Sequence, residues 1–372
     1  MAPTSLPDGL AAYLRQRFAG REVVRAIELG VDEAKGAGET SKGIGYGSVW
    51  RIQLAEGGRA PLDLVLHSPK SDDFGHDRRA DRASGALLAY DSFGLLRSHA
   101  RALDVGAVRA DGTLVSLGDT GEFWLLTEWL EGEPYAQDLR RVARDASLGT
   151  QDLERAERLA RYLAELHFEQ PPGGAPAYRR AVRDLVGHGE GIFGMIDGYP
   201  DDLPEASAAR LEAIELGAVR WRSRLRGRHH RLRRTHGDFH PFNLLFDASG
   251  ELGVLDTSRG SLGDPADDVA CLALNYLFFG LELDDDAWRR SLGRLYHRFF
   301  ETYLEHRDDP ELFEVIGPYF AWRGLVLASP RWYPDLPPRD RDKLLHFVEH
   351  ALDGTRPFHP ALAEEVLRCT AA

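Results

Sequence analysis

Hydrophobic and polar residues alternate with two different periods along this chain, and the change of period divides it into two parts. Up to about residue 130, apolar positions recur mostly at every second residue, which is typical of strands. The expected strands cover residues 21–29, 47–54, 60–68, 113–118 and 122–130. Short helices are expected at residues 8–19 and 77–93. The first three strands, joined by glycine-rich turns, predict an antiparallel sheet.

After residue 130 the apolar positions follow a helical period. Leu159, Leu163 and Leu166 share one face of an amphipathic segment whose other face is charged. Further helices are expected at residues 205–226, 286–306 and 338–352. Residues 171–204 are rich in Gly, Pro and Asp and predict a long surface connection. The pattern predicts an α+β protein, with a small antiparallel β-rich lobe at residues 1–130 and a larger helical lobe at residues 131–372.

Length, charge and cysteine content narrow the class of protein. A chain of 372 residues exceeds one ordinary core, so two lobes with a ligand-binding cleft between them are expected. A net charge of −13 argues against general binding to nucleic acid or anionic membranes, because both present phosphates. The longest apolar run is too short to cross a bilayer, and Cys271 and Cys369 allow at most one disulfide. These features predict a cytoplasmic protein.

Polar side chains are concentrated in the stretch "RTHGDFHPFNLLF", residues 234–246. Asp238 precedes Asn243 by five residues, and the following strand, turn and strand should fold Asp256 back beside Asn243. Mg²⁺ prefers oxygen ligands of the carboxylate and amide type. Phosphoryl transfer to a hydroxyl requires such ligands and a carboxylate that accepts or orients the hydroxyl proton. The spacing therefore favours phosphoryl-transfer chemistry.

Two motifs, "HGDFHPFN" and the later "LDTSRGSLGDPADDVA", resemble the aminoglycoside phosphotransferase and choline kinase family, relatives of the protein kinases. The resemblance implies a bilobal protein-kinase-like fold, ATP as phosphoryl donor, Mg²⁺ as cofactor and a small hydroxyl-bearing acceptor. It implies that Asp238 is the catalytic base and that Asn243 and Asp256 hold the metal. It also implies that Asp268 braces the catalytic loop, while Asp264 is expected to cap the following helix.

A glycine-rich turn, "SKGIGYGS" at residues 41–48, lies between two expected strands. Glycines allow backbone N–H groups to approach phosphate oxygens, so Gly43, Gly45, Gly47 and Ser48 are candidates for contacts with the ATP phosphates. A hairpin turn also needs glycines for steric reasons alone. The turn supports nucleotide binding only in combination with the catalytic motif.

The lysine that this family places on its third strand is missing here. The strand reads "LVLHSPK", and His67 occupies the matching position. Lys70 at the strand end or Lys42 in the glycine-rich turn could replace it. Its acidic partner is expected on the next helix, at Asp77 or Asp81. Each of these residues could equally belong to a solvated strand end or helix face.

Three other segments have both a functional and a structural interpretation. In "LLTEWLEG", residues Glu128 to Leu130 resemble a hinge that offers backbone groups to adenine, although an extended connector would look alike. Residues 220–234 contain eight arginines, which favour a solvated helix face over a site for RNA or an anionic substrate. The acidic segment "LELDDDAW" could line an acceptor pocket or cap a helix.

The sequence thus predicts an ATP- and Mg²⁺-dependent kinase that acts on a hydroxyl of a small molecule, such as an aminoglycoside-like antibiotic, an amino alcohol or a sugar. The missing strand lysine motivates the alternative of a regulatory protein that binds nucleotide without catalysis. Protein kinase activity is disfavoured by the absence of "HRD" and "APE" motifs. His236 and His240 are expected to hydrogen-bond the backbone, since no zinc-type pattern surrounds them.

Overall fold

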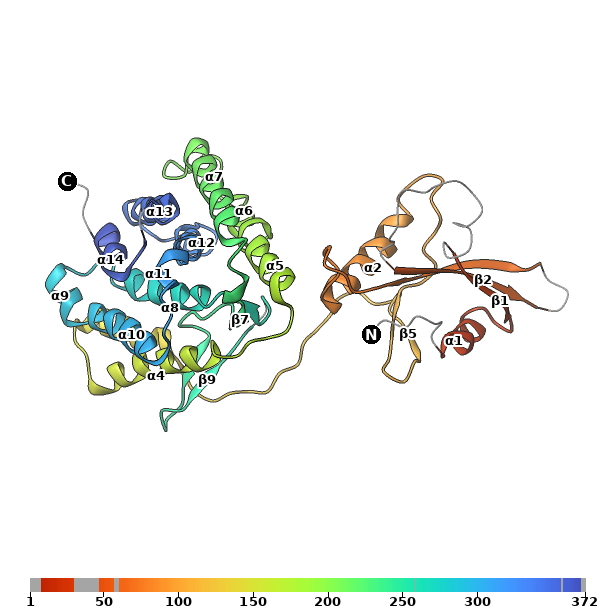
Figure 1. Ribbon diagram of the computed structural model, residues 1–372, viewed down its shortest axis with the longest axis horizontal. Coiled ribbons are helices and arrows are strands. Elements are labelled where there is room, and N and C mark those ends of the chain that lie inside the picture. The colour runs from red at the N-terminus through yellow and green to blue at the C-terminus, as the bar shows by residue number, and fades with distance from the viewer. Residues whose placement is uncertain (1–7, 30–46, 57–59, 258, 356, 369–372) are drawn as a thin grey trace. The chain divides into compact units, whose positions relative to one another are not determined.

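The computed structural model describes residues 8–29, 47–56, 60–257, 259–355 and 357–368. The chain forms two compact units, residues 1–127 and 128–372, which are coloured red to orange and yellow to blue in Figure 1. The division lies three residues before the predicted boundary at 130. The predicted α+β class is confirmed: the strands of the first unit form small antiparallel sheets, and the second unit is mainly helical.

The described residues of the first unit form two helices and two antiparallel sheets. Strands β1, β2 and β3 form one sheet in that order, and β4 pairs with β5. The elements are α1 (Leu10–Arg17), β1 (Glu22–Glu28), β2 (Gly47–Ala55), β3 (Leu62–Pro69), α2 (Arg79–Phe93), β4 (Gly106–Val108) and β5 (Leu114–Ser116). The predicted three-stranded antiparallel sheet is therefore confirmed.

Alternation along the strands explains the small core of this unit. Ile52 and Leu54 of β2 lie on one face of the sheet, where they pack with Leu10 and Leu14 of α1. The opposite face is more exposed and mixed in character: Val65 is 54% exposed there, and Arg51 forms an ion pair with Asp63 on β3, with N–O 3.2 Å. The sheet thus has one apolar face, which α1 covers.

The prediction of a strand at residues 122–130 is wrong. Residues 121–130 have no regular secondary structure, and Trp124, Leu125 and Leu126 are 82–88% exposed. The segment is predicted as a strand because it is rich in aromatic and apolar residues, which are common in strands. A strand also needs a hydrogen-bonded neighbour, and none of the described strands pairs with this segment.

The second unit is mainly helical, with short strands in two small antiparallel sheets. Strands β6, β8 and β9 form an antiparallel sheet, and β7 pairs with β10. Its strands are β6 (Glu133–Pro134), β7 (Arg233–Arg234), β8 (Leu244–Phe246), β9 (Leu252–Val254) and β10 (Leu262–Gly263). Its helices are α3 (Tyr135–Asp145), α4 (Thr150–Leu166), α5 (Gly174–Gly187), α6 (Ile192–Ile196), α7 (Ala208–Leu225), α8 (Ala266–Phe279), α9 (Asp285–Arg290), α10 (Leu292–His306), α11 (Leu312–Val315), α12 (Gly317–Ala328), α13 (Pro338–Asp353) and α14 (Pro360–Arg368), together with the 3₁₀ turn His229–Arg231.

Helix α8 lies inside this unit, in contact with α10 and α12 (Figure 1). From Val269 to Leu277 all its residues are buried and most are apolar, as expected for an enclosed helix segment. Cys271 on α8 is buried, as its apolar surroundings predict. None of the described helices has the length and apolar character needed to span a membrane.

Two helical predictions in this unit need correction. Residues 171–204 contain α5 and α6 instead of a long surface connection, because Tyr178, Val182 and Leu185 recur at helical spacing and are buried. The single helix expected at residues 286–306 is two helices, α9 and α10. They are separated at Ser291, whose φ of −126° and ψ of −108° are not helical.

Candidate active site

The loop that carries the polar motif joins β7 to β8, and the sheet pairing fixes where it begins. Because β7 pairs with β10, which leads directly into α8, the start of the loop lies beside the first turn of α8. The Asp268 carboxylate in that turn accepts the backbone N–H groups of His236 at 2.7 Å and Gly237 at 2.8 Å. Gly237 has φ +83°, which favours glycine. The predicted bracing role of Asp268 is confirmed by these bonds.

A buried polar chain supports Asp268 from behind. His167, at the end of α4, is fully buried and contacts Asp268 Oδ2 through Nε2 at 3.1 Å. Its Nδ1 lies 2.8 Å from the Tyr303 hydroxyl on α10. Burial acts to raise the pKa of Asp268, but hydrogen bonds from His167 and the loop backbone hold it below its ordinary value. Three helices, α4, α8 and α10, therefore hold the backbone of one loop.

Both histidines of the loop bond to the backbone, as predicted. His236 Nε2 donates to the Leu255 carbonyl at 2.8 Å, while its Nδ1 accepts the Asp238 N–H at 3.2 Å. His240 Nδ1 accepts the Phe242 N–H at 3.2 Å. The Nε2 atom of His240 lies 3.6 Å from Asp238 Oδ2. Burial lowers the pKa of His240, against the opposing effect of the Asp238 charge.

The hairpin that follows the loop brings Asn243 and Asp256 close together in the backbone. Leu244 pairs with Val254, and the Leu255 N–H donates to the Asn243 carbonyl at 2.9 Å. Asp256 comes next, with φ +51°, an uncommon backbone conformation for a residue other than glycine. The Asn243 amide donates to the Asp238 carbonyl at 3.1 Å. The three residues singled out by spacing thus belong to one continuous loop and hairpin.

The Asp238 carboxylate is bound by an arginine that the sequence interpretation missed. Arg323 on α12 donates from Nη1 to Asp238 Oδ1 at 2.6 Å. Its Nη2 donates to the Gly237 carbonyl at 2.7 Å and to Asp267 Oδ1 at 2.8 Å. Burial acts to raise the pKa of Asp238, but Arg323, with His240 and Arg259, holds it below the ordinary value. Asp238 is therefore an ionised carboxylate in an ion pair.

A second arginine lies near the carboxylate. Arg259, from the loop after β9, stacks on the Trp322 ring with its guanidinium 4.1 Å from the centroid, and Arg323 lies 3.9 Å from the same centroid. Arg259 and the Trp322 indole both donate to the Glu190 carbonyl, at 3.2 and 2.9 Å. Two guanidinium groups thus pack against one indole ring, and one of them binds the Asp238 carboxylate.

A comparison with known families identifies the chain. The model of the phosphotransferase enzyme family matches residues 77–311, more than half of the sequence. The chain belongs to this phosphotransferase family. The resemblance drawn from the two motifs is thereby confirmed. No curated protein matches the sequence.

Solved structures that resemble this family member do so weakly. A glucosamine kinase in complex with glucosamine, ADP and inorganic phosphate is 19% identical, with 59% of each chain covered and a TM-score of 0.39. Choline kinase LicA from Streptococcus pneumoniae is 15% identical, with 93% of this chain and 96% of the other covered and a TM-score of 0.34. An aminoglycoside phosphotransferase from Alicyclobacillus acidocaldarius subsp. acidocaldarius DSM 446 is 16% identical, with 87% and 91% covered and a TM-score of 0.32.

The candidate phosphate-binding residues of this phosphotransferase-family chain fall partly outside the described residues. Gly43, Gly45 and Lys42 are among those not described. Gly47 and Ser48 form the start of β2, opposite Pro69 and Ser68. A Cβ atom at Gly47 would lie 2.2 Å from the Ser68 carbonyl oxygen, so this close strand pairing requires glycine. The phosphate-binding role of the turn stays a prediction.

The candidates for the phosphate anchor lie on or near β3. His67 is an exposed residue of β3, opposite Val49 on β2, and Lys70 follows the end of the strand. Asp81 is one candidate for the acidic partner of the phosphate anchor. Its carboxylate accepts the Arg78 N–H at 2.7 Å and so caps α2. Asp77 directly precedes that cap in the sequence. The roles assigned to these residues remain predictions.

Two hinge candidates, Glu128 and Leu130, open the second unit. Both are exposed in the irregular segment that precedes β6. Backbone N–H and C=O groups of such a segment are not used by a described sheet, which is the condition for offering them to a nucleotide base. Their contact with adenine stays a prediction.

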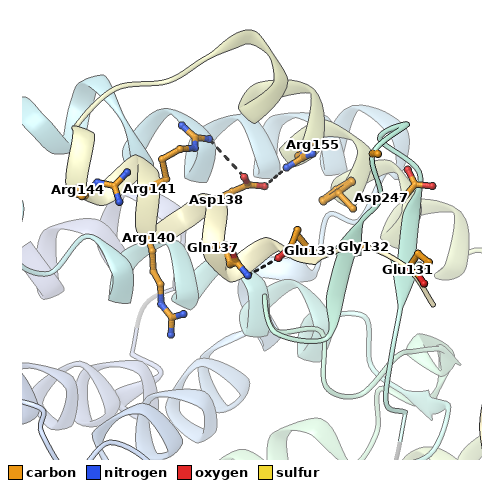
Figure 2. A pocket seen from close by; sticks show the side chains of 12 residues that line it. Glu131, Gly132, Glu133, Gln137, Asp138, Arg140, Arg141, Arg144, Arg155 and Asp247 are labelled. Carbon is orange, nitrogen blue, oxygen red and sulfur yellow. Dashed lines mark hydrogen bonds and ion pairs between the residues drawn. The ribbon is translucent and has the colours of Figure 1, made fainter. Parts of the chain in front are cut away.

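A cavity of about 830 Å³ lies elsewhere in the second unit (Figure 2). It is lined by β6, α3, α4 and the end of β8, and its described lining does not include Asp238, Asn243 or Asp256. Arg141 and Arg155 both point at Asp138, and Arg155 also stacks on Phe246 at 4.6 Å. Asp138 thus pairs with two of the arginines that line this cavity, and the lining includes no residue of the candidate catalytic loop between β7 and β8.

Proposed function

We propose that this protein is a kinase that transfers the γ-phosphoryl group of ATP to a hydroxyl of a small molecule. Family membership supports phosphotransferase chemistry. The observation that carries the proposal is the Asp238 carboxylate, held on a braced loop directly before the hairpin of Asn243 and Asp256. This arrangement provides one fixed carboxylate for the acceptor and two oxygen-bearing side chains for a cation.

Asp238 receives or orients the proton of the acceptor hydroxyl. Its Oδ1 is bound by Arg323, so Oδ2 is the oxygen offered to the acceptor. A carboxylate paired with arginine is a weak base. That suits a loose transition state in which the phosphoryl group departs before much proton transfer is needed. Alignment of the hydroxyl is then the main contribution of Asp238.

The residues present fit a magnesium ion. Asn243 and Asp256 offer only oxygen ligands, and the Asn243 amide nitrogen is already used on the Asp238 carbonyl, which leaves its side-chain oxygen for a cation. In the described residues no cluster of three or more His, Cys, Asp or Glu side chains could hold a metal. Mg²⁺ tolerates so few protein ligands because water and phosphate oxygens complete its shell. When bound, it would neutralise charge on the phosphates.

The test is acceptor-stimulated release of ADP, screened over hydroxylated antibiotics, amino alcohols and sugars. Asp238→Asn keeps an oxygen that can accept from Arg323 but replaces the second oxygen, which orients the acceptor hydroxyl, by an amide NH₂ group that can neither accept a hydrogen bond nor take a proton. Turnover is therefore expected to fall by about 10²- to 10⁴-fold. The matched control is Glu301→Gln, at a side chain that is 61% exposed on α10. ATP binding, followed by thermal shift, should be unchanged in both variants. Full turnover by Asp238→Asn would contradict the proposal.

The alternative, a nucleotide-binding regulatory protein, retains support from His67 at the strand position where the family places lysine. The same screen separates the two functions. ATP binding by the wild-type protein with no ADP release for any acceptor would favour the regulatory role over the kinase.

A further inference from the structure

Arg323 is buried in an unusual place for an arginine. It lies in the apolar stretch "YFAWRGLVL" of α12 and is only 5% exposed. Lys and Arg are almost never buried unless they are paired. Its hydrogen-bond partners among the described residues are on the candidate catalytic loop or on α8: Asp238, the Gly237 carbonyl and Asp267.

Stability alone does not explain this arginine. Replacing a buried ion pair by apolar residues is often neutral or stabilising, because burial of the charges is costly. The Nε atom of Arg323 is buried and has no hydrogen-bond partner within the described residues, so the burial is only partly compensated. A buried cation that pairs directly with the candidate base points to a role in the site.

The geometry shows what Arg323 adds to the brace made by Asp268. Asp268 binds backbone N–H groups of His236 and Gly237, which fixes the path of the loop but not the rotamer of the next side chain. Arg323 binds that side chain directly, at Asp238 Oδ1. Neighbouring acids on α8 therefore have separate tasks: Asp268 holds the backbone, and Asp267 anchors the arginine that holds the carboxylate.

The fork of the guanidinium matters for this task. Nη2 is tied to Gly237 and Asp267, so the direction of Nη1 is fixed by a planar group and not by a flexible chain. Nη1 then determines where Oδ1 of Asp238 lies. With Oδ1 fixed, the second oxygen, Oδ2, has one defined position.

We propose that Arg323 is a positioning residue that holds the Asp238 carboxylate through Oδ1 so that Oδ2 meets the acceptor hydroxyl, an inference that rests on the kinase function proposed above. Because misplacement of a reacting group by about 1 Å can cost about 10²-fold, Arg323→Met should lower kcat by about that factor. The KM for ATP should change little, since Arg323 acts on the acceptor side through Asp238. Arg323→Lys keeps the charge without the fork and should recover part of kcat.

The matched control is Arg231→Met. Arg231 is also 5% exposed and is held by two carboxylates, Asp264 and Asp309, but it does not bind Asp238. It reports the effect of losing a buried, doubly paired arginine in the same unit. Arg231→Met should unfold at lower temperature while keeping the kcat of its folded fraction.

A crystal structure of Arg323→Met supplies a readout that does not depend on activity. The Asp238 carboxylate should occupy a changed or divided rotamer, while the backbone of His236 and Gly237 stays on Asp268. An unchanged Asp238 rotamer would overturn the positioning role even if no acceptor were known. An unchanged kcat in folded Arg323→Met, or an equal loss of kcat in Arg231→Met, would do the same. Lack of turnover by the wild type with every acceptor would count instead against the kinase function.

Discussion

The two units of the chain differ in how deeply they bury their stabilising groups. In the described part of the first unit, the fully buried apolar side chains are Leu10, Leu14, Ile52 and Leu54, and α2 buries none. The core of the second unit draws on nearly all of its helices, from Tyr135 on α3 to Leu367 on α14. The candidate catalytic loop is anchored in the more deeply packed unit, as expected for a site that depends on exact placement of a side chain.

Hydrogen-bonded polar side chains are also more deeply buried in the second unit than in the first. In the first unit, Asp104 makes its bonds in a partly exposed setting, with 17% of the side chain accessible. In the second unit, Asp268 and His167 are fully enclosed. An enclosed polar network is costly to break because every freed group remains without water. The comparison predicts that equal substitutions have larger effects in the second unit.

Asp268→Ala should have the largest effect. It removes the acceptor for two backbone N–H groups and leaves His167 without its carboxylate, all in a buried setting. Loss of one partner from such a network costs about 3–5 kcal/mol. The free energy of unfolding of the second unit, measured by hydrogen exchange of α8 and α10 amides, should fall by that amount, and turnover should fall with it.

Asp286→Ala provides the control for that measurement, since its exposed carboxylate serves no buried group. Its exchange rates should match those of the wild type. If Asp268→Ala proved as stable as this control, the buried chain from Tyr303 to the loop would have no structural importance, and the contrast between the units would be lost.

Sequence reasoning succeeded where a local pattern determines the structure. Alternation predicted β1 to β3, and the strand–turn–strand signal predicted the hairpin of β8 and β9, which Asn243 precedes and Asp256 follows. It failed at residues 122–130, where a strand-like composition has no described strand as a partner. It failed also at α5, where glycines and prolines at the helix start masked buried positions at helical spacing.

Arg323 shows a second reason why sequence reasoning can miss a residue of the site. Its partners, Asp238 and Asp267, are 85 and 56 residues away in sequence, and no local pattern connects them. One signal was available, because a charged residue within "YFAWRGLVL" must find a buried partner if that stretch is a core helix. Which partner it finds depends on the packing of α12 against α8, and this follows only from the tertiary structure.

Leucine truncations test the contrast between the cores. Leu163 on α4 and Leu54 on β2 are both fully buried. Truncation of a buried leucine to alanine costs about 2–5 kcal/mol, and the value depends on how far the surroundings relax. Leu163→Ala should lie near the upper end of that range because α4 is packed against α10. Leu54→Ala should lie near the lower end. Hydrogen exchange of amides in each unit measures both, and equal losses would remove the distinction in packing.

Asp104→Asn should have the smallest effect, about 1 kcal/mol, since a hydrogen bond in a partly exposed setting contributes about that much. Asp104 accepts from Tyr13, from Ser116 Oγ at 2.7 Å and from the Val105 N–H at 2.8 Å.

The effect of Asp104→Asn should also depend on pH. Burial acts to raise the pKa of Asp104, but these bonds hold the pKa below its ordinary value. A carboxylate whose pKa is lower in the folded state than in the unfolded state stabilises the fold at any pH above its unfolded-state pKa, which is about 3.9. This stabilisation disappears as the pH falls through the folded-state pKa. The difference between wild type and Asp104→Asn, read from exchange of β5 amides, should therefore be constant from pH 5 to 8 and shrink below about pH 4. A difference that grew in acid would mean that Asp104 stabilises the first unit in its protonated form, against the bonding seen here.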